Sequence, residues 1–397
     1  MATHYANGKT TTSGLVFMYD TVDKENCYKG EPTTNLVDYS EYQYLADNYT
    51  AALGGWDTFE GNFLIDVINK VPGYTNRSIK MTSVQANVYK YHFNVPLTSG
   101  QTYTVSFWGK ATSAGNYGNF LLADGPSGYL VFEPGGYSSV TTEFTRFTYT
   151  FVVPSTGTYN FATYLYGDGQ VVWLSGFQLE NKSHATQYLP SNGAATLRSA
   201  TQGLLDLTNT NQIDLSNVSF DANAQINFDG TNDYVNIGTN SSLAITGDMT
   251  ICAWVYINNF SATYNSIIGK TTSGGMPAPY DYYTNINTGK LVFLRGNGSI
   301  YAYTTSIASP ALNAWQFVAV TMSGITITHY LNGETNGVGT ASTTIADNGD
   351  NALIGSRGDY VTKMNGKIST LQIYNRALTQ TEVTQNYNAT KSRFNLA

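Results

Sequence analysis

Short runs in which apolar and polar residues alternate recur along the whole chain. The run 367–374 is a clear example, because Ile368, Leu371 and Ile373 are separated by polar residues. Alternation of this kind places successive side chains on opposite faces of a strand, so each run predicts a half-buried β-strand. Gly, Asn, Asp and Pro lie in the intervals and predict turns. The pattern therefore predicts an all-β chain built from many short strands.

The predicted strands form two groups along the chain. One group lies within residues 35–190 and comprises 103–108, 147–153, 159–166 and 171–179. The other group begins with 14–20 and resumes with 250–257, 266–270, 290–295, 315–322, 325–331, 352–355 and 367–374. Regular short strands separated by turn signals are typical of β-sandwiches. Residues 271–287, which are rich in Gly, Pro and Tyr, are predicted to form a long loop.

After residue 374 the pattern changes from that of a strand to that of a short helix. Thr379 is a favourable N-cap residue, and Glu382 follows it by three positions. This is the spacing of a capping box, in which each of the two side chains accepts a hydrogen bond from the backbone of the other residue. We therefore expect a short capped helix after the last strand.

Several motifs of the second group are similar to those of a known family. Residues 364–394 contain a strand that ends in Tyr-Asn-Arg-Ala-Leu and a capped helical turn, and they resemble the closing segment of laminin-G-like jelly rolls of the concanavalin A-like lectin/glucanase superfamily. Phe-Asp-Gly-Thr-Asn-Asp-Tyr at 228–234 and Tyr-Leu-Asn-Gly at 330–333 resemble further motifs of that family. The trailing residues 386–394 are most similar to the variant found in virion structural proteins of tailed bacteriophages.

The resemblance implies that one domain interrupts another. The first strand of such a jelly roll matches 14–20, but the next piece of the family pattern follows only at 203–235. Residues 172–190 resemble the last strand and exit of a carbohydrate-binding-module jelly roll. We therefore expect two jelly-roll β-sandwiches, the first inserted into the second, concanavalin A-like one. The expected parts are a flexible N-terminal anchor (1–13), a first laminin-G-like strand (14–34), an inserted carbohydrate-binding-module-like β-sandwich (35–190) and the remainder of the concanavalin A-like domain (191–397).

Composition narrows the function classes. Charged residues make up 12% of the chain and aromatic residues 14%, which argues against disorder. The net charge is −7 and no Lys/Arg cluster is present, so nucleic acid is not an expected partner. Two cysteines, Cys27 and Cys252, cannot form a disulfide framework in a chain of this size. With no apolar signal core and no window of membrane-spanning length, we expect synthesis in a host cytoplasm and no membrane partner.

The sequence contains no recognisable catalyst. The laminarinase branch of the superfamily uses the strand motif Glu-x-Asp-x-x-Glu, and no glutamate of this chain begins it. The four histidines fit neither His-Glu-x-x-His nor a Cys/His metal spacing, and no Gly-x-Ser-x-Gly elbow or P-loop occurs. We therefore expect no enzyme activity, no catalytic residue and no cofactor.

Two acidic turns hold side-chain oxygens close together, as calcium ligands require. The first contains Asp229 and Asp233, and the second contains Asp347 and Asp350. Asp and Asn side chains also stabilise turns by accepting hydrogen bonds from their own backbone. The turn interpretation is favoured, and calcium binding is not predicted.

Aromatic side chains are the candidates for sugar binding, because a pyranose ring stacks on an exposed aromatic ring. We select residues in turn-rich segments of both domains: Trp56, Tyr117, Tyr129, Tyr137, Tyr280, Tyr282 and Tyr283. The run 277–283 is the preferred contact surface, since loops commonly carry binding residues. The competing interpretation is that most of the 31 tyrosines cover sheet faces or subunit contacts.

These observations predict a non-enzymatic virion structural protein, a capsid decoration, head-fibre or tail-fibre component that displays lectin-like sandwiches on the particle surface. Two alternatives remain open: a phage adhesin that binds a host glycan, and, less favoured, an accessory module of a secreted polysaccharide-degrading enzyme. The expected partners are other virion proteins and further copies of the chain. A trimer is one arrangement, although no heptad repeat specifies it.

Overall fold

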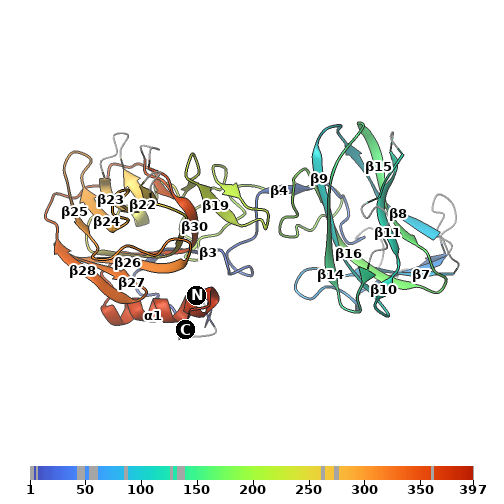
Figure 1. Cartoon of the computed structure of the whole chain (residues 1–397), viewed down its shortest axis with the longest axis horizontal. Coiled ribbons are helices and arrows are strands. Elements are labelled where there is room, and N and C mark those ends of the chain that lie inside the picture. Colours follow the sequence, from blue (N-terminus) through green and yellow to red (C-terminus); the bar gives the residue numbers. More distant parts are fainter. Residues whose placement is uncertain are drawn as a thin grey trace. The chain divides into compact units, whose positions relative to one another are not determined.

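The computed structural model describes residues 1–397 except 1–3, 6–7, 43–49, 53–60, 85–87, 126–127, 132–138, 261–263, 272–276, 359–361 and 397. The regular secondary structure of the described chain is almost entirely β-strand (Figure 1). It divides into two compact units by contact: unit 1 is Met1–Pro32, Ser199–Asp221 and Gln225–Ala397, and unit 2 is Thr33–Arg198 and Ala222–Ala224. Unit 2 thus interrupts unit 1 in the sequence. The predicted fold class, two sandwiches with the first inserted into the second, is confirmed.

Unit 2 is built on a six-stranded and a four-stranded antiparallel sheet. The larger sheet has the order β14 (Thr145–Val152), β9 (Thr102–Ala111), β16 (Val171–Glu180), β7 (Ser78–Ser83), β6 (Gly61–Asp66) and β5 (Thr50–Ala52). The smaller has the order β12 (Gly128–Val131), β11 (Gly118–Gly125), β15 (Gly157–Leu165) and β8 (Val88–Leu97). Two short pairs join β10 (Gly115–Asn116) to β13 (Ser139–Val140) and β4 (Thr33–Asn35) to β17 (Thr196–Arg198). Phe107, Phe161 and Phe177 pack together in its core.

Unit 1 has an eight-stranded and a six-stranded sheet around its main core. The first has the order β18 (Ser219–Phe220), β19 (Ile226–Asp229), β30 (Asn365–Tyr374), β21 (Met249–Ile257), β26 (Trp315–Ser323), β27 (Thr326–Leu331) and β28 (Glu334–Thr340), with β3 (Leu15–Asp20) also paired to β30. The second has the order β20 (Val235–Asn236), β29 (Ala352–Ile354), β22 (Asn265–Thr271), β23 (Pro277–Thr284), β24 (Leu291–Gly296) and β25 (Tyr301–Thr305). Outside these sheets, β1 (His4–Tyr5) pairs with β2 (Gly8–Lys9).

Strand β30, which lies near the C-terminus, pairs with β3, which lies near the N-terminus. It pairs with β21 along one edge, and β3 pairs with it in antiparallel register from Leu15 opposite Tyr374 to Asp20 opposite Thr370. The apolar residues of β30 also explain an irregularity. Ile368 and Leu371 are three positions apart, yet both are buried in the same core. The register with β21 shifts between them, and this bulge turns both side chains to one face.

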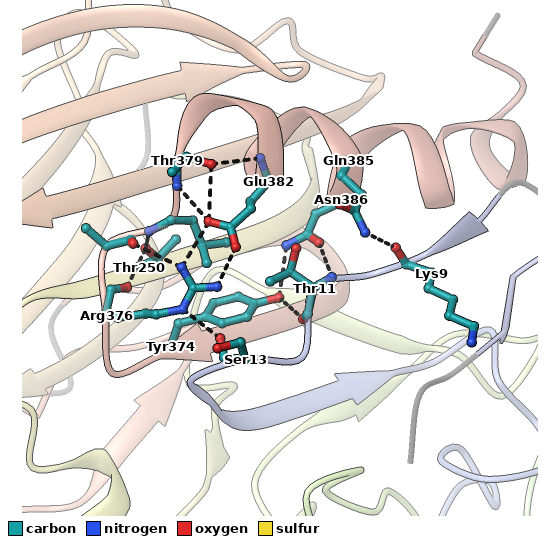
Figure 2. A network of polar contacts seen from close by, with 12 residues as sticks. Lys9, Thr11, Ser13, Thr250, Tyr374, Arg376, Thr379, Glu382, Gln385 and Asn386 are labelled. Carbon is teal, nitrogen blue, oxygen red and sulfur yellow. Dashed lines mark hydrogen bonds and ion pairs between the residues drawn. The ribbon is translucent and has the colours of Figure 1, made fainter.

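Helix α1 (Gln380–Thr390) follows β30 and lies over the opposite face of the eight-stranded sheet, on a second small core that includes Trp254, Phe317 and Val383. Its predicted capping box is confirmed: the Glu382 backbone donates to Thr379 Oγ1, and the Thr379 backbone donates to Glu382 Oε2 over 2.9 Å (Figure 2). None of the helices in the described residues is both long and apolar enough to cross a membrane.

The segment just before β3 is held by α1 and β30 (Figure 2). The Thr11 backbone N–H donates to Asn386 Oδ1 over 2.8 Å, and the Tyr374 hydroxyl donates to the Thr11 carbonyl over 2.9 Å. Gln385 Nε2 donates to the Lys9 carbonyl over 2.7 Å. Residues 9–13 are therefore part of unit 1, and the expected flexible anchor over 1–13 is wrong for them. These contacts use backbone atoms, which leave no trace in a hydrophobic pattern.

Candidate functional site

The candidate site is a groove of about 630 Å³ on the outer face of the six-stranded sheet of unit 1. This volume lies within the range of small-molecule pockets. The residues that line it are aromatic, polar, aliphatic or basic: Tyr264, Tyr283, Asn285, Thr288, Lys290, Val292, Leu294, Tyr301, Tyr303, Thr305 and Arg357. Most of them lie on β23, β24 and β25 or in the turn between β23 and β24.

Strand register places the groove residues in rows. Directly paired residues run across β23, β24 and β25 in two rows: Tyr283 with Val292 and Thr305, and Asp281 with Leu294 and Tyr303. Neighbouring positions such as Tyr282 and Phe293 point to the opposite face and belong to the main core. Because side chains alternate along each strand, the core and the groove share the same three strands. Val292 and Leu294 form an apolar floor.

Four tyrosines give the groove its aromatic surface. Tyr301 and Tyr303 are 46% and 58% exposed, and their ring centroids are 6.4 Å apart. Tyr264 and Tyr283 meet edge to face with centroids 5.4 Å apart. Burial, and the nearby carboxylate of Asp281, raise the pKa of Tyr283 above its usual range, so its hydroxyl stays protonated at neutral pH. Such rings can stack on an apolar ligand face while their hydroxyls form hydrogen bonds.

The charged residues of the groove are basic. Lys290 is half-buried immediately before β24, and Arg357 has a side chain only 18% exposed. Arg357 Nη1 lies 3.6 Å from Oδ2 of Asp281, whose side chain is fully buried beneath the groove surface. No Asp or Glu is among the described residues that line the groove. The arrangement can stack a ring, donate hydrogen bonds and attract negative charge.

The structure corrects the sequence-predicted contact run 277–283. Instead of a loop, these residues form most of β23. Tyr280 and Tyr282 are fully buried in the main core, and the Tyr282 hydroxyl donates to the Ala319 carbonyl over 3.2 Å. The expectation that they are exposed is wrong, because alternation turns every second residue inward. Tyr283 points to the other face of the sheet, and of the three tyrosines predicted in this run it is the one that lines the groove.

The sugar-binding candidates of unit 2 form no site in the part of the chain that the structure describes. Tyr117 is 7% exposed and its hydroxyl donates to the Ser113 carbonyl over 2.7 Å, so the expected exposure is wrong for it. Tyr129 belongs to β12, but its side chain is outside the described part of the structure, as are Trp56 and Tyr137. For these three residues, sugar binding stays a prediction.

Sequence reasoning missed most of the groove. Five of its lining residues are not among the sugar-binding candidates that the sequence predicts: Tyr264, Tyr301, Tyr303, Lys290 and Arg357. A signal was present in the sequence of β25, Tyr-Ala-Tyr-Thr-Thr, where alternation predicts a strand with both tyrosines on one face. Lys290 and Arg357 carry no such signal, since only the pairing of strands brings them to the same groove.

The two acidic turns use their oxygens within the protein. Asp347 forms an ion pair with the buried ammonium of Lys270. Asp229 Oδ1 accepts from the Thr231 backbone over 2.7 Å, and Asp233 Oδ2 accepts from the Asp229 backbone over 2.8 Å. Over the described ranges, no three His, Cys, Asp or Glu residues are grouped so that they could hold a metal ion.

Comparison with known proteins agrees with the fold of unit 1. Residues 229–384 match the family model of the concanavalin A-like lectin/glucanases superfamily. The match covers less than half of the chain and lies in unit 1, from the end of β19 into α1. Unit 1 therefore contains a concanavalin A-like domain. No curated protein matches the chain.

The solved structures that are similar to this chain include toxin binding domains. The binding domain of Paraclostridial Mosquitocidal Protein 1 is 16% identical over 47% of this chain and 49% of that chain, with a TM-score of 0.37. The binding domain of botulinum neurotoxin DC, solved in complex with rat synaptotagmin II, is 15% identical over 48% of this chain and 50% of that chain, with a TM-score of 0.38. The chain spans about half the length of these structures, and likeness at this level does not indicate a shared ligand.

Proposed function

We propose that unit 1, a concanavalin A-like domain, is a non-catalytic lectin-like module that binds a glycan in the groove across β23, β24 and β25. The observation that carries this proposal is the pair of exposed rings of Tyr301 and Tyr303 beside the apolar floor of Val292 and Leu294. Pyranose rings have an apolar face of C–H groups and a rim of hydroxyls. A floor of aliphatic and aromatic side chains with polar groups at the rim matches both.

The groove chemistry supports binding without cleavage. A retaining glycosidase needs two carboxyl groups about 5 Å apart on either side of the scissile bond, and an inverting enzyme needs about 6.5–9.5 Å. The described residues that line the groove include no carboxyl group. The nearest acidic residue of the paired rows, Asp281, is fully buried and lies against Arg357. A bound glycan is therefore expected to leave the groove unchanged.

A glycan array with the purified full chain tests this function. We expect reproducible binding to one class of sugar, and a loss of about tenfold or more in affinity for Tyr303→Ala, because an exposed ring lost from a binding site removes on the order of 1.4 kcal/mol or more. Tyr74→Ala is the matched control, since Tyr74 is 51% exposed and lies in unit 2. Silence across the array, or equal loss for both variants, would contradict a sugar site in this groove.

The setting that we propose for this module is the surface of a phage particle, where the chain would be a decoration or fibre component together with other virion proteins and further copies of itself. This part rests on the resemblance of residues 364–394 to phage virion proteins. Synthesis in the host cytoplasm would precede assembly. Mass spectrometry of purified particles is the test, and absence of the chain from every particle fraction would remove the virion role while leaving the sugar-binding proposal intact.

A further inference from the structure

The charge of the groove identifies a class of ligand. We infer that the groove selects anionic glycans, in which a carboxylate or sulfate on the sugar is held by Lys290 and Arg357. This inference rests on the proposed sugar-binding function and deepens it. A neutral glycan would use the tyrosines and the apolar floor alone, whereas an anionic one would use both halves of the lining.

Lys290 provides the first cation. It lines the groove, and within the described part of the chain its ammonium has no ion-pair partner. Its backbone is fixed by the turn between β23 and β24, since its carbonyl accepts from Asn285 N over 2.8 Å and its N–H donates to Thr288 Oγ1 over 3.3 Å. The side chain of Lys290 therefore begins at a fixed position beside the groove.

Arg357 provides the second cation, and Asp281 orients it. The carboxylate of Asp281 is fully buried on β23, so it holds the guanidinium at a fixed place on the groove wall. A guanidinium has five N–H donors in a planar fork, and it can contact a carboxylate and a further anion at the same time. Arg357 thus resembles a positioned binding residue more than a solvated surface charge.

The surroundings favour an anion further. The protein as a whole is acidic, with 27 Asp and Glu against 20 Lys and Arg, yet the described lining of this groove has no acidic residue. The buried Asp281 offsets the charge of Arg357, so Lys290 supplies the net positive charge of the described lining. The tyrosine hydroxyls of the lining can also donate to an oxyanion. In a partly enclosed groove these interactions are screened less than at an open surface.

The test compares charged oligosaccharides with their neutral counterparts, by calorimetric titration of the full chain. The probes are a galacturonic acid tetrasaccharide, its methyl ester, a neutral galactose tetrasaccharide and a sulfated galactose tetrasaccharide. We expect one or both anionic probes to bind about tenfold tighter than the neutral ones at low salt, with the difference shrinking as salt rises. The carboxylate and sulfate probes tell which anion the groove takes.

Variants assign the effect to the groove. Lys290→Gln should bring the affinity for the preferred anionic probe close to that for its neutral counterpart, so that the ratio of the two affinities falls from about ten towards one. Lys70→Gln, which removes an exposed charge in unit 2, is the matched control and should change neither affinity. Thermal unfolding of both variants should match that of the parent chain.

The outcomes separate the two proposals. Equal affinity for neutral and anionic probes, both lost in Tyr303→Ala, would overturn the anion preference and leave the sugar-binding function standing. An anion preference that persists unchanged in Lys290→Gln would also overturn the inference. Absence of binding to all four probes, together with a silent array, would remove the proposed function itself.

Discussion

At the scale of single residues, the position of a side chain along its strand decides whether it contacts the core or solvent. Tyr282 and Tyr283 are neighbours on β23, but the first is fully buried and the second lines the groove. The sequence could not indicate which of them faces solvent, because two consecutive tyrosines are equally compatible with either one pointing into the core. The sequence does indicate that Tyr301 and Tyr303 lie on the same face of a strand, because one small residue separates them.

His329 makes the stability of unit 1 depend on pH. The ring is fully buried on β27, and its Nε2 lies 2.8 Å from Thr304 Oγ1. Burial lowers its pKa from 6.5 to about 4. The unfolded chain therefore binds this proton more readily than the folded one, so the free energy of unfolding falls as the pH drops from about 6.5 towards 4. One such group removes about 2 kcal/mol between about pH 7 and about pH 5.

Denaturant unfolding at about pH 7 and about pH 5 measures this effect, with His329→Gln as the comparison. We expect the parent chain to lose about 2 kcal/mol more than the variant over that interval. The other titratable groups behave alike in both chains, so they cancel in the difference. An identical pH dependence for the two proteins would show that His329 is not the group responsible.

At the scale of elements, strands and caps were predictable where local rules decide them. The capping box of Thr379 and Glu382 needs only two residues at a fixed spacing, and it was read from the sequence. The strand β23 was missed because two prolines and a pair of glycines precede Tyr280, and such residues normally predict a loop. Its place between β22 and β24 supplies the hydrogen bonds that overcome this local preference. The bulge in β30 is likewise set by its partner strand.

Gly366 at the start of β30 tests how tightly that strand is packed. Its φ is 147°, and a Cβ there would lie 1.9 Å from the carbonyl oxygen of Tyr256. We expect Gly366→Ala to lower the free energy of unfolding by more than about 2 kcal/mol, from strain and steric overlap together. Gly247→Ala is the control, since a Cβ at that position meets nothing within 4 Å. Equal unfolding midpoints for the two variants would contradict this packing.

At the scale of the whole molecule, unit 1 is assembled from chain segments on both sides of unit 2. Phe17 and Tyr19 of β3 lie in the same core as Ile368 and Ile373 of β30, and the Tyr19 hydroxyl donates to the Ile368 carbonyl over 3.1 Å. The order of the laminin-G-like motifs predicted this interruption, because the first strand of the family pattern, 14–20, is separated in the sequence from the next motif, 203–235. The packing of residues 9–13 against α1 was not predictable, since it depends on backbone atoms that any sequence carries.

Excision of unit 2 tests this arrangement. Thr33 and Arg198 are directly paired across β4 and β17, so the two ends of unit 2 lie side by side. We expect residues 33–198 alone to unfold cooperatively. We expect residues 199–397 alone to be strongly destabilised, because β30 would lose its partner β3 and the core would lose Phe17 and Tyr19.

The control for this experiment joins residues 1–32 to 199–397 through a short Gly-Ser linker. This chain restores β3 and should regain most of the stability of unit 1, as measured by thermal unfolding. Residues 199–397 alone that proved as stable as the linked chain would show that β3 is dispensable, and the two sandwiches would then be better described as joined end to end.

The claim that a glycan binds in the groove without being cleaved is tested most directly by a crystal structure of the full chain with the oligosaccharide that gives the strongest array signal. We expect a sugar ring to lie against Tyr301 and Tyr303, with the oligosaccharide intact and its polar groups near Lys290 or Arg357. A sugar bound only in unit 2, or a cleaved oligosaccharide in the groove, would contradict the claim.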